Sequence, residues 1–106
     1  MSYIQPVINA FLNKKDKKVN NTESLGGMLF LFGNKIAEWR NNDIWVTTCG
    51  WKTAATRDRL QLLGANLKVR KGIWYLNNEE WQGNWVNMKY YTKEKSKQQK
   101  QQLFEE

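Results

Sequence analysis

Apolar residues near the start of the chain recur at the spacing of an α-helix. They stand at i, i+3, i+4, i+7 and i+8 and comprise Ile4, Val7, Ile8, Phe11 and Leu12. Pro6 suits the first turn, so we expect the helix to begin near Gln5 or Pro6. The Lys- and Asn-rich run that follows predicts a solvated connector, which ends at Gly26-Gly27.

Residues 28–49 alternate between two kinds of side chain at the period of β-strands, which predicts three strands joined by two tight turns. We expect these turns at Gly33-Asn34 and Asn41-Asn42. The facing pairs would be Phe32 and Lys35, Leu31 and Ile36, Phe30 and Ala37, and Met28 and Trp39 across the first turn, then Arg40 and Asp43, Trp39 and Ile44, Glu38 and Trp45, and Ala37 and Val46 across the second. The core face then comprises Met28, Phe30, Phe32, Ala37, Trp39, Ile44 and Val46.

The other face of these strands mixes apolar with charged side chains. It comprises Leu29, Leu31, Ile36, Glu38, Arg40, Asp43, Trp45, Thr47 and Cys49. Its apolar members are too many to leave in water, so we expect another element to cover part of this face. The N-terminal helix is the obvious candidate, with Trp45 packed beneath it.

A second helix is predicted after these strands. Thr53 or Thr56 can cap its start, and Gly64 stops it. We expect it to lie on the face that carries Trp39 and Val46. Its buried stripe would comprise Ala55, Thr56, Leu60 and Leu63, with Arg57, Asp58 and Gln61 facing out.

Residues 67–77 predict a second hairpin with Lys71-Gly72 at its turn. One side would pair Leu67 with Leu76 and Val69 with Trp74, and is apolar. The other side would be basic with an aromatic ring and comprises Lys68, Arg70, Ile73 and Tyr75. Residues 81–85 then predict a turn before a last short strand, which runs from Trp85 to Met88.

Together these elements predict an α+β fold with a small antiparallel sheet. In chain order it would consist of an N-terminal amphipathic helix, a three-strand meander, a helix and a second hairpin. We expect three parts: residues 1–23 as the N-terminal helix and basic connector, 24–92 as the α+β core domain, and 93–106 as a polar Lys/Gln tail. The tail has a disordered composition, although a helix held by Tyr90, Tyr91 or a partner is also plausible.

Composition excludes several kinds of chemistry. The 106 residues include no His, one Cys, six Trp, 17 Lys plus Arg and 10 Asp plus Glu, for a net charge of +7. Without His, and with Cys49 alone, a zinc site, a catalytic triad and a disulfide framework all lack their components. No secretory signal or membrane span is readable, so we expect a single reduced domain in the cytoplasm and no membrane partner.

The remaining reactive groups have ordinary structural explanations. The carboxylates Glu38, Asp43, Asp58, Glu79 and Glu80 fall in turns or beside Lys and Arg, where solvated ion pairs explain them. Cys49 is expected to be a buried structural thiol. With no visible acid and base pair, we expect no enzymatic activity, no cofactor and no metal site.

Residues 29–63 resemble a short domain of unknown function that occurs in many hypothetical phage proteins. The resemblance is carried by Phe30, Phe32, Ile36, Ala37, Thr47, Thr48, Thr53 and Thr56. It implies an origin in a phage or another mobile element, and it transfers no functional residue. The order of three strands and a helix also looks like the DNA-reading domain of plant ethylene-response factors and the arm-binding domain of phage integrases, at the level of fold alone.

The leading functional hypothesis is a non-enzymatic protein that binds DNA or RNA. Basic groups on the second hairpin and at the start of the second helix would contact phosphates, and one aromatic would stack on a base. The residues concerned are Lys52, Arg57, Lys68, Arg70, Lys71 and Tyr75. A sequence pI near 9.6 favours this hypothesis.

The rival hypothesis is a protein-interaction module, either an inhibitor of a host defence protein or a component of the virion. It would use exposed aromatic anchors, for which the candidates are Trp45, Trp51 and Trp81. Each of these could instead be a core residue. The sequence leaves the oligomeric state open.

Overall fold

The computed structural model describes residues 3–91, which form two helices and nine strands. Their bounds are α1 Gln5–Leu12, β1 Lys17–Val19, β2 Thr22–Leu25, β3 Met28–Leu31, β4 Asn34–Arg40, β5 Asp43–Val46, α2 Ala54–Leu62, β6 Leu67–Arg70, β7 Ile73–Leu76, β8 Glu79–Glu80 and β9 Val86–Asn87. An antiparallel sheet has the strand order β1-β2-β3-β4-β5-β9, and a smaller one has the order β6-β7-β8. The α+β prediction is confirmed.

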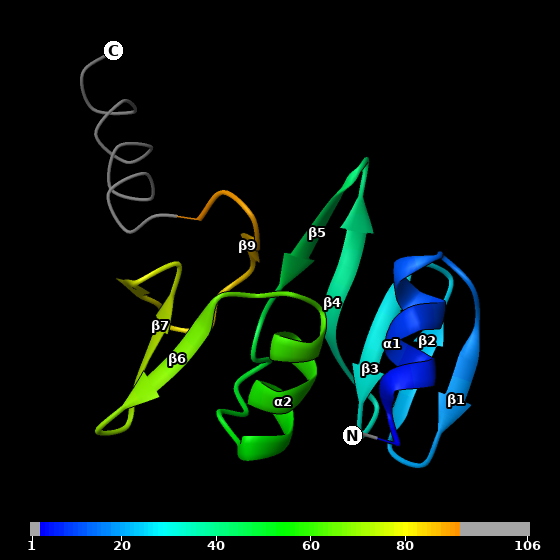
Figure 1. The fold of residues 1–106 in the computed structure, drawn as a ribbon, viewed down its shortest axis with the longest axis horizontal. Coiled ribbons are helices and arrows are strands. Elements are labelled where there is room, and N and C mark those ends of the chain that lie inside the picture. Colours follow the sequence, from blue (N-terminus) through cyan, green and yellow to red (C-terminus); the bar gives the residue numbers. More distant parts are fainter. Residues whose placement is uncertain (1–2, 92–106) are drawn as a thin grey trace.

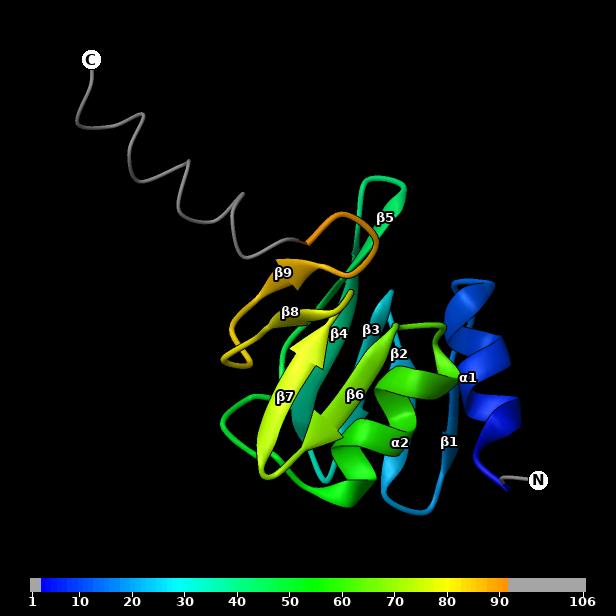
Figure 2. The same cartoon turned by 60° about the vertical axis from the view of Figure 1, so that its left-hand side comes forward.

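Both helices and the smaller sheet lie on one side of the larger sheet (Figure 1). The turned view in Figure 2 shows β6 and β7 next to α2, with β4 behind them. The core is one cluster of buried apolar side chains shared by these layers. The molecule therefore has a covered face and an open face on its larger sheet.

Helix α1 forms where the sequence predicts it. Pro6 stands in its first turn, where a missing backbone N–H costs nothing. Val7, Ile8 and Phe11 are buried, whereas Leu12 at the end of the stripe is 38% exposed. The helix packs on β1 and β2 and touches α2, so it covers the first strands of the larger sheet.

The solvated connector predicted after α1 is wrong, because residues 17–25 form the hairpin β1–β2. Asn20 sits at its turn with a φ of 56°, a left-handed conformation that Asn tolerates well. Thr22 and Ser24 on β2 are buried beneath the helix, and the Ser24 hydroxyl donates to the Lys15 carbonyl oxygen at 2.6 Å. The expected boundary after residue 23 thus falls inside β2.

The register predicted between β3 and β4 is also wrong. The turn residues are Phe32 and Gly33, with φ of 52° and 79°, one position earlier than expected. The observed pairs are Met28 and Glu38, Leu29 and Ala37, Phe30 and Lys35, and Leu31 and Asn34, with an irregularity beside Leu29 and Phe30. Beside the turn the pairing has moved by two residues along β4, and beyond the irregularity it has moved by one, which exchanges the two faces there. Leu29 and Leu31 are buried, while Phe32 is 69% exposed.

The other two registers are confirmed. Between β4 and β5 the pairs are Ala37 and Val46, Glu38 and Trp45, Trp39 and Ile44, and Arg40 and Asp43. Between β6 and β7 they are Leu67 and Leu76, Lys68 and Tyr75, Val69 and Trp74, and Arg70 and Ile73. Both registers follow from the turn residues, Asn41-Asn42 and Lys71-Gly72, which fix which residues stand opposite one another.

The predicted position of Trp45 beneath α1 is wrong. Helix α1 lies on the covered face, where the Trp39 indole N–H donates to the Phe11 carbonyl oxygen at 2.8 Å. Trp45 precedes the buried Val46 on the same strand, so its side chain points to the open face. Leu29 and Leu31 are covered, as predicted for this face, because both are buried in the cluster that also contains the buried residues of α1.

Helix α2 begins at a Thr53 cap, whose hydroxyl accepts the Thr56 backbone N–H at 3.2 Å. Leu60 is fully buried on it, as predicted, and Gly64 follows its end with a φ of 106°. The unexpected buried residue is Arg59, which is only 7% exposed. Its guanidinium reaches across to the turn between β1 and β2.

The segment from residue 81 to residue 88 closes the fold as expected, with a turn and then β9. Gly83 is buried there with a φ of 95°, and its carbonyl oxygen accepts the Thr47 hydroxyl at 2.6 Å and the Thr48 backbone N–H at 2.9 Å. The predicted tail over residues 93–106 lies outside the described residues. Within residues 3–91, neither helix has the length and apolar character needed to cross a membrane.

Candidate nucleic-acid interface

The outer face of the hairpin β6–β7 carries the first group of predicted site residues. Lys68 and Arg70 are exposed on β6, and Tyr75 is half-buried opposite Lys68 on β7. These three side chains and Asn78 line a shallow hollow of about 300 Å³. Their alternation with the buried Leu67 and Trp74 is what turns all three outward.

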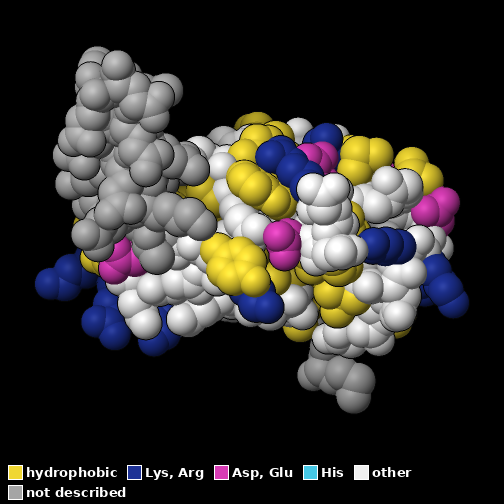
Figure 3. All heavy atoms as spheres, turned by 90° about the horizontal axis from the view of Figure 1, so that it is seen from above, with side chains coloured by type: hydrophobic (Ala, Val, Ile, Leu, Met, Phe, Trp, Pro, Cys, Tyr) yellow, Lys and Arg dark blue, Asp and Glu magenta, His cyan; other side chains and the backbone are white. Residues whose placement is uncertain are grey.

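Lys71 and Gly72 form the tip of this hairpin, with φ of 51° and 79°. Two successive left-handed residues are the requirement of a tight hairpin turn that matches the strand twist. Lys71 is exposed, so its ammonium projects beyond the end of the strands. In the space-filling view, basic side chains project from the end of the molecule where β6 and β7 lie (Figure 3).

Lys52 and Arg57 do not join that outer face. They line a separate hollow of about 280 Å³ together with Val69, Gly72 and Trp74, which lie on the inner side of the hairpin or at its turn. The structure therefore distributes the predicted basic residues around the hairpin, two on its inner side, two on its outer side and Lys71 at the tip. They form a basic rim around one projecting element.

One acidic residue adjoins the outer face. Glu80 on β8 pairs with Tyr75, which extends that face with a carboxylate. Glu79 pairs with Leu76 beside it. Positive charge is therefore concentrated toward the tip of the hairpin, on Arg70 and Lys71, and diluted at its base.

The predicted aromatic anchors separate into three different environments. Trp81 is wrong as an anchor, because it is 1% exposed and its indole N–H donates to the Asn84 carbonyl oxygen at 3.0 Å. Trp45 is half-buried under the Arg40 guanidinium, whose central carbon lies 4.5 Å from its ring centroid and 5.0 Å from that of Trp85. Only Trp51, at 59% exposed, presents a free ring.

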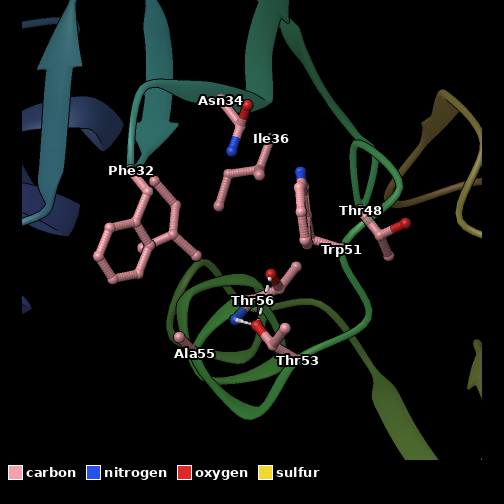
Figure 4. A pocket seen from close by; sticks show the side chains of 9 residues that line it. Phe32, Asn34, Ile36, Thr48, Trp51, Thr53, Ala55 and Thr56 are labelled. Atoms are coloured by element: carbon pink, nitrogen blue, oxygen red, sulfur yellow. Dashed lines mark hydrogen bonds between the residues drawn. The ribbon is translucent and has the colours of Figure 1, made fainter.

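Trp51 forms one wall of a cleft that the sequence did not indicate. Phe32, at the turn between β3 and β4, stands on the opposite side, and Figure 4 shows Ile36 and Thr56 between the two rings. The cleft measures about 390 Å³. Its floor includes the buried Leu31, while Asn34 and Thr53 add polar groups at its edges. The segments that meet here are separate in the sequence, and only the unexpected turn at Phe32 brings its ring outward.

The ionisable groups of the open sheet face form a structural ion-pair network. Glu38 accepts a hydrogen bond from the Lys35 ammonium at 2.8 Å and another from Arg40. These two partners, Lys35 first, hold the pKa of the Glu38 carboxyl below its ordinary value, against a smaller opposing effect of burial. A carboxylate so neutralised is a poor general base.

Two further observations bear on chemistry. Cys49 is exposed, so the prediction of a buried thiol is wrong. It lies in the loop between β5 and α2 that also carries Trp51, and its φ is 54°. Among residues 3–91, no three His, Cys, Asp or Glu side chains are grouped closely enough to hold a metal ion.

A family model described as Kyanoviridae Gp96 protein matches residues 2–98 of the chain. The chain belongs to this family. The family is a phage protein family, which confirms the origin that the resemblance over residues 29–63 implied. The match covers more of the chain than residues 29–63, and its range includes α1, the hairpin β6–β7 and β9.

No curated protein and no solved structure matches the chain significantly. The Gp96 match therefore identifies the lineage, and the analogy with plant and integrase DNA-reading domains gains no support. Function has to be argued from the surfaces described above.

Proposed function

We propose that this phage protein binds nucleic acid through the basic hairpin surface, defined as Lys52, Arg57, Lys68, Arg70, Lys71 and Tyr75. The observation that supports this most directly is the hollow on the outer face of β6–β7, where Lys68, Arg70 and Tyr75 share one surface of about 300 Å³. Two cations spaced along a strand, beside an aromatic ring, suit a phosphate backbone with a base next to it.

The distribution of ion pairs supports the same proposal. Among residues 3–91, the ion-paired cations are Lys35, Arg40 and Arg59. The five cations of the basic hairpin surface have no carboxylate partner within that part of the chain. Their charge is available to a polyanion, because no ion pair among residues 3–91 must break before phosphate binds.

The mechanism is neutralisation of phosphates around a projecting hairpin. Phosphate contacts position a protein on nucleic acid and carry no base information, so sequence selectivity is weak and affinity falls steeply with salt. The protein acts in the cytoplasm of the infected host cell and catalyses no reaction.

Binding to labelled mixed-sequence DNA and RNA oligonucleotides in low salt tests this function. The triple variant Lys68→Ala/Arg70→Ala/Lys71→Ala should lose roughly 10-fold or more in affinity. A matched control is Lys15→Ala/Lys17→Ala/Lys18→Ala, which removes the same charge from exposed positions near β1. If both triple variants weaken binding equally, the charge acts without a site and the basic hairpin surface is not the interface. If the native protein does not bind at all, the function is excluded.

A protein-interaction module is the second candidate, and the exposed rings of Phe32 and Trp51 favour it. Its target would be a host defence protein or a virion component. Co-purification from nuclease-treated host lysate separates the two functions, because a nucleic-acid partner is digested while a protein partner is retained.

A further inference from the structure

The cleft between Phe32 and Trp51 has the volume and the lining of a small-ligand pocket. Its volume of about 390 Å³ lies within the range of roughly 300–1,000 Å³ that is typical of small-ligand pockets. Its floor is apolar and already buried, so a ligand would displace water from a surface that water solvates poorly. The hydroxyl of Thr53 and the carboxamide of Asn34 stand at its edges as hydrogen-bonding groups.

The two aromatic walls have no evident role in stability. Phe32 is 69% exposed and Trp51 is 59% exposed, so neither ring gains much from burial. Phe32 also holds a φ of 52°, a conformation that costs a residue with a Cβ about 1–2 kcal/mol relative to Gly. Burial within residues 3–91 does not explain either ring, so both are candidates for contact with a ligand.

Positive charge adjoins the cleft on one side. Thr53 lines both this cleft and the hollow that contains Lys52 and Arg57, so the two cavities share a wall. Among the described residues, no Asp or Glu lines either cavity. The combination is an aromatic slot next to two cations.

We infer that this cleft binds an unpaired base of single-stranded nucleic acid between Phe32 and Trp51, with the adjoining phosphates held by Lys52 and Arg57. A planar base can stack on the exposed Trp51 ring while Phe32 borders the other side of the cleft, and stacking of this kind accepts any base. An apolar peptide side chain could fill the slot as well, but it would leave Lys52 and Arg57 without a counterpart. Charge complementarity therefore favours the nucleotide.

This inference rests on the proposed nucleic-acid binding and adds to it a preference for single strands over duplexes. A base in a duplex is stacked and paired, so it can enter the cleft only after being extruded, which costs a few kcal/mol. The protein should therefore prefer a single strand to a duplex of the same sequence. Phosphate contacts made by the cations of the basic hairpin surface provide no such distinction.

The test compares affinities for a labelled single strand and its duplex at one salt concentration. The variants are Trp51→Ala and Phe32→Asn; the second retains a residue that tolerates the left-handed turn, so it removes the ring while preserving the fold. Each should weaken single-strand binding roughly 10-fold and leave duplex binding unchanged. The control is Leu25→Ala, which removes an exposed apolar side chain at the opposite end of β3 and should change neither affinity.

A second readout distinguishes stacking from charge. Loss of a stacking contact lowers affinity at every salt concentration without changing the slope of log K against log salt, whereas loss of a phosphate contact reduces that slope. Trp51→Ala should therefore shift the line in parallel, and Lys52→Ala should flatten it.

The outcomes distinguish failure of this inference from failure of the proposed nucleic-acid binding. If the native protein binds nucleic acid and both ring variants bind as tightly as it does, the cleft is not a base site and the basic hairpin surface survives. If no oligonucleotide binds, both fail. If Trp51→Ala abolishes capture of one protein from nuclease-treated lysate while oligonucleotide binding is unaltered, the cleft is a protein-docking site and the inference is overturned.

Discussion

Gly83 lies buried between two threonines at the end of β5. Its carbonyl oxygen accepts hydrogen bonds from the Thr47 hydroxyl and the Thr48 backbone N–H, which joins the start of the β9 segment to the loop after β5. A Cβ on Gly83 would overlap the Thr48 side chain, and its φ of 95° is unfavourable for any other residue. Both steric space and backbone conformation therefore require glycine here.

Gly83→Ala should lower the free energy of unfolding by at least about 2 kcal/mol, because a strained backbone and a steric overlap act together. Urea denaturation followed by tryptophan fluorescence measures this. Gly50→Ala is the matched control, since Gly50 has a φ of 80° but no atom within 4 Å of an added Cβ. It isolates the cost of the backbone, which is about 1 kcal/mol. Equal losses in the two variants would show that Thr48 moves aside freely.

Phe32 occupies a turn position that its residue type does not favour. A turn at Gly33-Asn34 satisfies the usual preference for small polar residues, and nothing local favours a phenylalanine with positive φ. The register is instead set from the other side of β3, where Thr22 pairs with Leu31 and Ser24 with Leu29. Strand β2 was not predicted, so its influence on β3 could not be foreseen.

Elements were predictable where their polar and apolar positions separate cleanly. The hairpin β6–β7 follows from its turn and from the separation of its two faces, the pairing of β4 with β5 follows from the turn at Asn41-Asn42, and α1 follows from its helical spacing. The hairpin β1–β2 carries no such signal, because its buried face consists of Thr22 and Ser24 while Lys17 and Lys18 are exposed. Its inward residues are small and polar because α1 lies directly over them.

Arg59 connects helix α2 to this unpredicted hairpin. Its guanidinium donates to the Thr22 hydroxyl at 3.0 Å, to the Asn21 side-chain oxygen at 3.2 Å and to the Asp58 carboxylate at 2.7 Å. The predicted buried stripe of α2 did not include it, since an arginine is rarely buried unless paired. The contact that buries Arg59 comes from a segment almost forty residues earlier, so helical periodicity could not indicate it.

Arg59→Leu should destabilise the protein by about 1–3 kcal/mol, because the buried polar groups of Asn21 and Thr22 lose their partner. Hydrogen exchange should show the loss as faster exchange of β1–β2 amides than of β6–β7 amides. Arg57→Leu, two positions away and outside any ion pair among residues 3–91, should change stability by less than about 0.5 kcal/mol. A uniform loss of protection in Arg59→Leu would instead mean that the guanidinium stabilises the whole core and not this hairpin.

On the scale of the molecule, the two candidate sites differ in how far apart in the sequence their residues lie. The outer hairpin face was predictable because Lys68, Arg70 and Tyr75 belong to one supersecondary unit whose register is readable. The cleft was not, because it assembles the turn before β4, the loop after β5 and the start of α2. Trp51 was recognised as a possible anchor, but its counterpart Phe32 was placed in the core. Sequence patterns identify faces of elements, whereas a cavity depends on how elements meet.

The net charge of +7 allows a final prediction that concerns the whole protein. If Lys52, Arg57, Lys68, Arg70 and Lys71 each neutralise one phosphate of a single strand, log K should fall with log salt at a slope of about −3.5. Lys68→Ala/Arg70→Ala/Lys71→Ala should reduce that slope by about 2, and Lys15→Ala/Lys17→Ala/Lys18→Ala should leave it unchanged. Fluorescence anisotropy between 50 and 200 mM salt, a range of about fourfold, suffices to measure both. Binding through diffuse charge would instead lower the two slopes equally, since each triple variant removes the same three charges.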